Sequence, residues 1–126
     1  MLLIDANAIL RFILFDNAEM ANKVCELIEK TKVTIRHEVL AEVVYVLNKV
    51  YLIPRVELVD SIQKFLKLSN VETESKDVLS LALETFAKTN LDFVDCLLYS
   101  FHTICYYDVF TFDKQLNSMF NKKFSE

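Results

Sequence analysis

The chain has 126 residues, of which 53% are hydrophobic, and a formal net charge of −4. This length suits one domain with a single core, and no stretch approaches the roughly 18 consecutive apolar residues that a membrane span needs. The negative charge excludes binding of nucleic acid by overall attraction, because contact with phosphate normally needs a basic surface. Any nucleic-acid partner must therefore be reached through a local patch or a metal ion.

The cysteines, the N-terminus and the absence of glycine each give one expectation. Cys25, Cys96 and Cys105 form none of the close pairs that are typical of zinc sites, and their odd number argues against a complete disulfide framework, so we expect them to serve in packing. The N-terminus lacks the basic flank and cleavage site of a signal peptide, and we expect a cytoplasmic protein. Because the chain contains no glycine, we expect asparagines such as Asn70 and Asn90 to adopt positive φ angles.

Short strands and helices alternate along the sequence. We expect strands at 2–5, in "KVTIR" (32–36), in "VETES" (71–75) and in "DVFTF" (108–112). Between the first and third strands we expect helices at 7–14, from a cap at Asp16 or Asn17 to about Lys30, at 37–51, and from Pro54 to about Leu68. After the third strand we expect helices from a cap at Ser75 to Lys88 and at 92–105, and a short C-terminal helix follows the last strand. Helices between successive strands imply crossover connections and a mainly parallel sheet covered on both faces. The sequence therefore predicts an α/β fold in one domain over residues 1–126.

Acidic residues follow two of these strands. Asp5 ends the first strand and Asp113 follows the last, and parallel strands bring such ends to the same edge of a sheet. At about 100° per residue, Asp92 and Asp95 share one polar face of an otherwise apolar helix. Glu42 lies on the flank of the apolar stripe of the helix at 37–51. Each acid alone suits a helix cap or a solvated surface, but together they would repel one another unless a cation compensates. Oxygen ligands of this kind suit Mg²⁺ or Mn²⁺.

Four segments carry these acids, and in order and spacing they resemble the four acidic motifs of the PIN domain, as found in the VapC-type toxins of prokaryotic toxin-antitoxin pairs. The segments are "LLIDANAILRFIL", "EVLAEVVYVL", "LDFVDCLLYS" and "VFTFDKQL". The similarity extends over almost the whole chain. It implies a PIN-like three-layer α/β/α fold with a short, mainly parallel central sheet.

The resemblance also implies roles for individual residues. The metal-binding and catalytic acids would be Asp5, Glu42, Asp95 and Asp113, with Asp92 as a further metal ligand. Asn7 and Thr111 match the polar positions that support the first and last acids by hydrogen bonding. The chain departs from the family at Ala6, where Thr or Ser is common, and it leaves little room for the usual last strand. Neither departure removes an acid.

The implied activity is metal-dependent cleavage of RNA phosphodiester bonds. One or two Mg²⁺ or Mn²⁺ ions on the carboxylates would activate a water molecule and neutralise charge on the phosphate. Arg11 and Lys114 are candidates to guide the RNA strand, with a solvated surface as the alternative for each. The resemblance further implies a small antitoxin protein as partner. A homodimer is expected as well, with the helices at 37–68 as the interface.

Two other enzyme classes agree less well with the residues. A phosphotransfer enzyme of the haloacid dehalogenase kind needs a second Asp two residues after the first, where this chain has Asn7. A response-regulator receiver needs an Asp at the end of a middle strand, whereas "KVTIR" ends in Arg36. The remaining alternative is a PIN-fold module that binds RNA or protein without cutting, because function follows from the site and not from the fold.

Overall fold

The structure is a computed structural model that describes residues 1–124, with side chains described as far as Phe120. The chain divides into two compact units, Met1–Lys76 and Asp77–Glu126. The N-terminal unit contains α1 (Ala6–Leu14), α2 (Ala18–Lys30), β1 (Val33–Ile35), α3 (His37–Tyr45), the π-helix η1 (Val46–Val50), α4 (Arg55–Leu66) and β2 (Val71–Thr73). α5 (Lys76–Lys88) begins at the last residue of this unit and otherwise lies in the C-terminal unit, together with α6 (Phe93–Cys105) and α7 (Lys114–Phe124). Along residues 1–124, no helix combines the length and the apolar character that crossing a bilayer requires.

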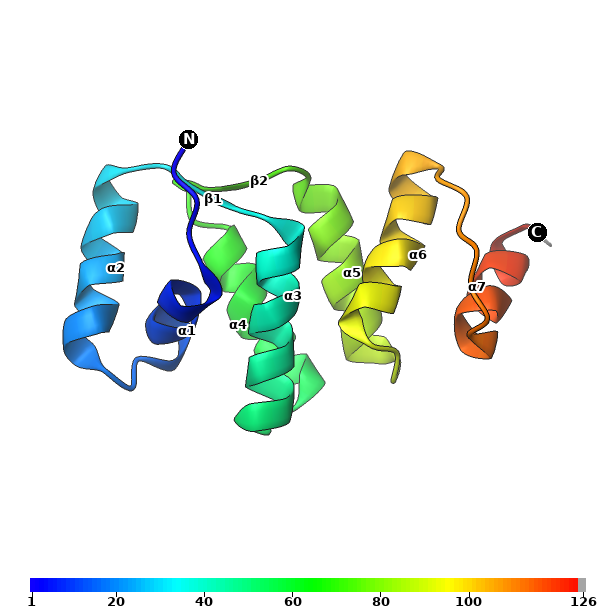
Figure 1. Cartoon of the computed structure of the whole chain (residues 1–126), viewed down its shortest axis with the longest axis horizontal. Coiled ribbons are helices and arrows are strands. Elements are labelled where there is room, and N and C mark those ends of the chain that lie inside the picture. The colour runs from blue at the N-terminus through cyan, green and yellow to red at the C-terminus, as the bar shows by residue number, and fades with distance from the viewer. Residues whose placement is uncertain (125–126) are drawn as a thin grey trace. The chain divides into compact units, whose positions relative to one another are not determined.

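A short parallel sheet lies within the N-terminal unit. β1 and β2 pair in parallel, with Val33 opposite Val71 in the register, and Figure 1 shows them side by side above the helices of this unit. The connection between them runs through α3, η1 and α4, as a parallel pair requires. Val33 and Ile35 are fully buried. The predicted α/β class with a short parallel sheet is confirmed, and helices predominate.

The predicted strand at 2–5 is reduced to a single bridge. Leu3 pairs in parallel with Thr34, whose backbone N–H donates to the Leu2 carbonyl oxygen at 2.7 Å and whose carbonyl accepts from Ile4 at 3.2 Å. Pairing stops there because α1 begins at Ala6 and turns the backbone away from β1. The first segment therefore joins the sheet over one residue only.

The predicted helices are confirmed, with small shifts of their ends. Asn17 caps α2, because its side-chain oxygen accepts the Met20 backbone N–H at 3.1 Å, and Pro54 directly precedes α4. The helix expected at 37–51 continues without interruption but changes from α to π geometry at Val46. Local caps and apolar spacing were sufficient to predict these segments.

Each unit buries apolar side chains of its own. In the N-terminal unit every helix contributes fully buried side chains, among them Ile9, Ala21, Leu40, Leu47 and Ile62. The ring of Phe12 packs against Phe65, with centroids 5.0 Å apart. In the C-terminal unit Leu79 and Cys96 are fully buried, and the Ser100 hydroxyl donates to the Val78 carbonyl. All three cysteines are free thiols, and the predicted packing role agrees with the burial of Cys96.

The predicted strand at 108–112 is wrong. Residues 106–113 have no regular secondary structure, and the side chains of Phe110 and Phe112 are 86% and 88% exposed. The described part of the C-terminal unit contains helices only, so this segment has no neighbouring strand within its unit. Its alternating aromatic residues are a strand pattern, but a strand needs hydrogen-bonding partners on a neighbour.

The expectation for the asparagines is also wrong. Positive φ angles occur at Phe15, Leu52 and Tyr106, and not at Asn70 or Asn90. Phe15 and Tyr106 are the residues that end α1 and α6, where a left-handed residue allows the last carbonyls to be satisfied. The Asn70 side chain instead donates to the Ile28 carbonyl oxygen at 2.7 Å.

Candidate metal centre

Asp5 is placed by the start of α1. Its backbone is extended, and its Oδ1 atom accepts the Ala8 backbone N–H at 2.9 Å, so it is the N-cap of the helix. The residue is exposed. An ionised carboxylate has two oxygens and about four lone-pair positions. Capping by one oxygen therefore leaves the other available to a cation.

The second acid of this unit is carried by a neighbouring helix. Glu42 is exposed on α3, one residue before the buried Val43. α3 packs against α1. The predicted supporting residue Asn7 is exposed in the first turn of α1. The N-terminal unit therefore supplies two solvent-facing carboxylates, Asp5 and Glu42, from two helices in contact.

Asp113 has the same local geometry as Asp5. Its Oδ1 atom accepts the Leu116 backbone N–H at 2.8 Å and so caps α7. The Thr111 hydroxyl oxygen accepts the Asp113 backbone N–H at 3.1 Å. The Asn117 side chain donates to the Thr111 carbonyl oxygen at 2.8 Å. These bonds fix the direction in which the chain enters α7 and hence the position of the Asp113 carboxylate.

Asn117 was not singled out in the sequence. The signal for it is weak, since an asparagine in the first turn of a helix is more often solvated than bonded back to the preceding loop. Tyr51 was not singled out either, and its hydroxyl is hydrogen-bonded to the Arg11 side chain. Neither contact follows from helical periodicity, because each joins a helix to a loop or to another helix.

Asp95 shows that three carboxylates of the C-terminal unit act on one another. Burial raises its pKa above the ordinary value, and the charges of Asp113 and then Asp92 raise it further. Asp92 is exposed and directly precedes α6, without a side-chain bond to the helix. The structure thus brings Asp92, Asp95 and Asp113 within electrostatic reach in one unit.

The two predicted RNA-binding cations differ in their surroundings. The Arg11 Nη1 atom lies 2.8 Å from both carboxylate oxygens of Asp16, and its side chain is only 17% exposed. The hydrogen bond with Tyr51 is the largest cause that raises its pKa. Lys114 is exposed at the start of α7 and has no ion-pair partner among the described residues. Arg11 is thus held within its own unit, whereas Lys114 is open to solvent.

The candidate acids are the right kind of ligand for a divalent cation, but neither unit, as far as it is described, gathers three of them around one point. All five acids offer carboxylate oxygens, the ligands that Mg²⁺ and Mn²⁺ prefer. Burial raises the pKa of Asp95 most, and repulsion from Asp113 and Asp92 adds a part that a cation would relieve. Within either unit, no three His, Cys, Asp or Glu side chains of the described residues are placed to hold a metal ion together.

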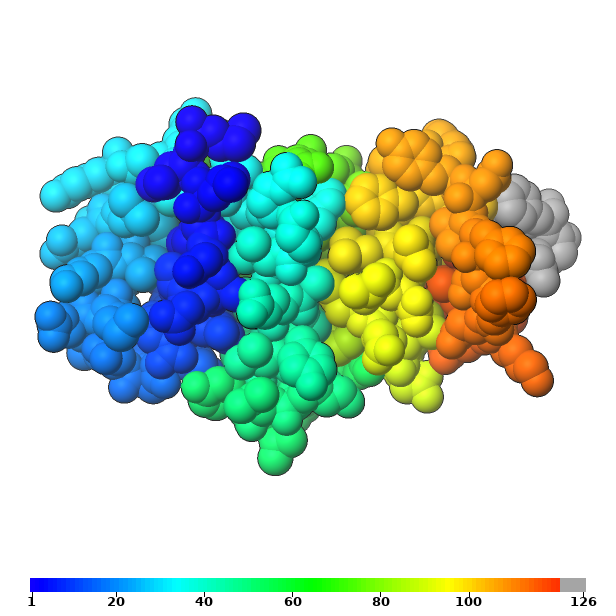
Figure 2. Space-filling model, in the orientation of Figure 1, coloured from blue at the N-terminus to red at the C-terminus, as the bar shows by residue number. Residues whose placement is uncertain are grey.

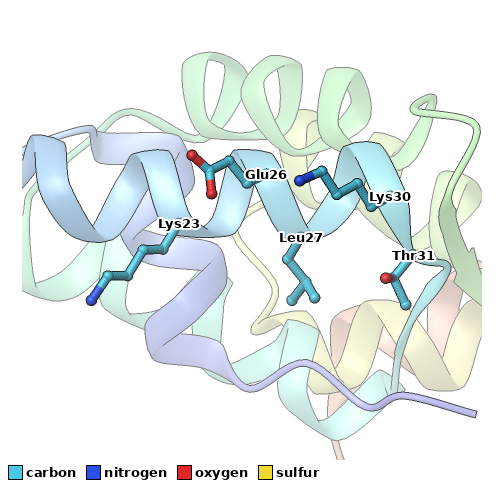
Figure 3. A pocket seen from close by; sticks show the side chains of 5 residues that line it. All are labelled: Lys23, Glu26, Leu27, Lys30 and Thr31. Atoms are coloured by element: carbon cyan, nitrogen blue, oxygen red, sulfur yellow. The ribbon is translucent and has the colours of Figure 1, made fainter.

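A surface hollow on α2 is unrelated to these acids. It has a volume of about 300 Å³ and is lined by Lys23, Glu26, Leu27, Lys30 and Thr31. Figure 3 shows that all five side chains come from α2 and the residue after it, with Leu27 and Thr31 pointing to the same side. None of the candidate acids contributes to it, and its open shape gives a ligand little enclosure.

Residues 2–120 match the family model of the PIN domain. This range includes all five candidate acids and spans both units. Neither the curated proteins nor the solved structures contain a match to this sequence.

Proposed function

Because the chain belongs to the PIN-domain family, whose members are generally nucleases, we propose that it is a metal-dependent endoribonuclease. The observation that carries this proposal is the family match over residues 2–120, which contains every acid that a PIN nuclease site needs. The match runs across both units, which supports a single PIN domain as the working enzyme.

The proposed site consists of Asp5, Glu42, Asp95 and Asp113, with Asp92 as an additional ligand for Mg²⁺ or Mn²⁺. The bound ion would supply Lewis-acid stabilisation of the phosphate and a more acidic water molecule. The chain's own residues then have distinct tasks. Asp5 and Asp113 are oriented by the helix ends that they cap, and Thr111 fixes the backbone at Asp113. Asn7 would support Asp5.

Charge is the main support for the metal. The chain carries a net charge of −4, and burial together with repulsion from Asp113 and Asp92 raises the pKa of Asp95. A phosphate backbone brought to such a site would be repelled as well. A divalent ion therefore has to precede or accompany the RNA, and Lys114 would add a local cation for the strand.

We further propose that the enzyme is the toxin of a toxin-antitoxin pair. The support is the likeness of the four acidic segments to VapC-type toxins. An antitoxin protein would block the acidic site, and a homodimer would cover exposed apolar side chains within residues 37–68, among them Val56 on α4. Light scattering on the purified protein distinguishes the dimer from a monomer.

The alternative is a PIN-fold module that binds RNA or protein without cutting it. The two proposals differ in what the acids do, since a binding module has no need of Asp5 and Asp95 together with a metal. Retention of all the acids favours the enzyme.

A cleavage assay separates them. Purified protein is incubated with a mixed RNA pool and Mn²⁺ or Mg²⁺, beside Asp5→Asn, Asp95→Asn and, as a control, Asp60→Asn. Asp60 is an exposed carboxylate on α4, paired with Lys64 at 3.0 Å. We expect cleavage by the wild type and the control, loss of at least about a hundredfold in the two site variants, and no cleavage in EDTA. Equal cleavage by all four proteins would refute the nuclease site.

A further inference from the structure

The exposed face of α3 and η1 carries a regular row of three side chains. Glu42, Tyr45 and Lys49 are spaced three and four residues apart, so each lies about one helical turn beyond the last. The opposite face is packed, since Val43 and Leu47 are fully buried. The row therefore points away from the core of the N-terminal unit and begins at a candidate metal ligand.

The helix that carries the row is continuous. The Val46 backbone N–H bonds back to the Glu42 carbonyl, and η1 continues with a five-residue bond from the Tyr51 N–H to the Val46 carbonyl at 3.1 Å. Figure 1 shows α3 running into η1 as one coil, and Figure 2 shows the atoms of residues 37–50 at the surface of this unit. π-helical turns occur frequently at functional sites. Glu42 and Lys49 are thus held about 10 Å apart on one rigid element.

Tyr45 and Lys49 are both free to meet a ligand. The Tyr45 side chain is 62% exposed and makes no ring contact with the described residues. Lys49 is exposed and has no ion-pair partner in the part of the chain that the structure describes, whereas Lys23, Lys32 and Lys64 each pair with an acid. An exposed aromatic ring beside an available cation is the combination that binds single-stranded nucleic acid, by base stacking and by contact with phosphate.

We propose that Tyr45 and Lys49 extend the site at Glu42 into a binding track for unpaired RNA. Tyr45 stacks on a base, and Lys49 contacts a backbone phosphate. This inference rests on the proposed function, since it assumes that the acids act on RNA. It assigns the base and phosphate contacts to Tyr45 and Lys49. A base held in a duplex is already stacked on its neighbours and is not available to the Tyr45 ring.

Four variants test the track. Tyr45→Ala and Lys49→Ala remove the two contacts, while Tyr45→Phe keeps a ring and Lys49→Arg keeps a cation. Lys67→Ala, at an exposed lysine that follows α4, is the matched control. All are compared by fluorescence anisotropy with a labelled unpaired RNA and with an RNA duplex, in the full chain carrying Asp95→Asn to prevent cleavage. Melting temperatures verify that each variant folds.

We expect Tyr45→Ala to weaken binding of unpaired RNA about tenfold and Tyr45→Phe to restore it, with duplex binding the same in both. Lys49→Ala should lower the slope of log affinity against log salt by about 0.7, and Lys49→Arg should restore it. Unchanged affinity and slope in both alanine variants would overturn the track. In that case cleavage by the wild type would still uphold the nuclease proposal.

Conversely, binding that depends on Tyr45 and Lys49 in a chain that never cleaves RNA would uphold the track and refute the nuclease. Weaker duplex binding that accompanies weaker binding of unpaired RNA in Tyr45→Ala would refute base stacking. A result in which Tyr45→Ala changes only the oligomeric state of the protein, with RNA affinity unchanged, would assign this face to a protein partner and overturn the proposal.

Discussion

Asp113 raises the pKa of Asp95 by charge repulsion, in addition to the larger effect of burial, so the ionised form of Asp95 is disfavoured in the folded chain. A raised pKa in the folded state makes the free energy of unfolding depend on pH. The stabilisation by the protonated Asp95 carboxyl group is complete below the ordinary pKa of 3.8 and is lost as the pH rises through the raised pKa. At neutral pH and without metal, Asp95 therefore destabilises the fold.

Replacing this carboxylate should consequently stabilise the protein. We expect Asp95→Asn to melt above the wild type in EDTA at about pH 7, by a few degrees at most, because solvent screens much of the repulsion at this partly exposed carboxyl group. The difference should shrink at about pH 3, below the ordinary pKa of 3.8, because the carboxyl group is protonated there. Calorimetry at both pH values measures it, with Asp60→Asn as control. A lower Tm for Asp95→Asn at neutral pH would contradict the repulsion.

The capping and metal-binding roles of Asp5 are separable by two substitutions. Asp5→Asn keeps an acceptor for the Ala8 N–H, whereas Asp5→Ala removes it. We expect the asparagine variant to retain the stability of the wild type within about 0.5 kcal/mol and the alanine variant to lose about 1 kcal/mol in urea unfolding. Both should lose cleavage. An asparagine variant that still cuts RNA would leave Asp5 with the cap alone.

Metal binding should be visible without any substrate. A ligand that binds only the folded state stabilises it by mass action, by about 2.7 kcal/mol at a hundred times its Kd. We expect millimolar Mn²⁺ to raise the Tm of the wild type and to have a much smaller effect on Asp95→Asn. Removal of the ion with EDTA should reverse the shift. If both proteins respond equally, the ion binds elsewhere.

Arg11 and Lys114 should respond differently to alanine substitution. Arg11 is tied to Asp16 and Tyr51, so Arg11→Ala should lower the Tm, whatever its effect on RNA. Lys114 is exposed at the positive end of the α7 dipole, so Lys114→Ala should leave the Tm unchanged or slightly raised. In RNA binding, Lys114→Ala should reduce the salt slope by about 0.7. An unchanged slope would remove Lys114 from the RNA contact.

Leu52 offers a test of the fold itself. It has a φ of 56° and is 78% exposed, and a left-handed conformation costs a residue other than glycine about 1–2 kcal/mol. Leu52→Gly should therefore stabilise the chain by about 1 kcal/mol in urea unfolding. Val50→Gly, two residues earlier in η1, should destabilise it instead. A loss of stability at Leu52 would indicate that its side chain makes contacts that outweigh the strain.

Sequence patterns alone were sufficient to predict the helices and the two paired strands. Asn17 predicted the start of α2, and apolar spacing predicted α3 and α6, because capping and helical periodicity act between residues a few positions apart. The family also follows from the sequence, since residues 2–120 match the family model.

The tertiary structure decided the features that need a distant partner. It limited the first strand to Leu3 opposite Thr34, left residues 108–112 without a strand, and engaged Arg11 with Asp16 and Tyr51. A strand exists only where a neighbour accepts its hydrogen bonds, and the charge on a side chain acts through whatever lies beside it in space. The repulsion felt by Asp95 has the same origin, because the carboxylate of Asp113 reaches it only through the packing of α7 on α6.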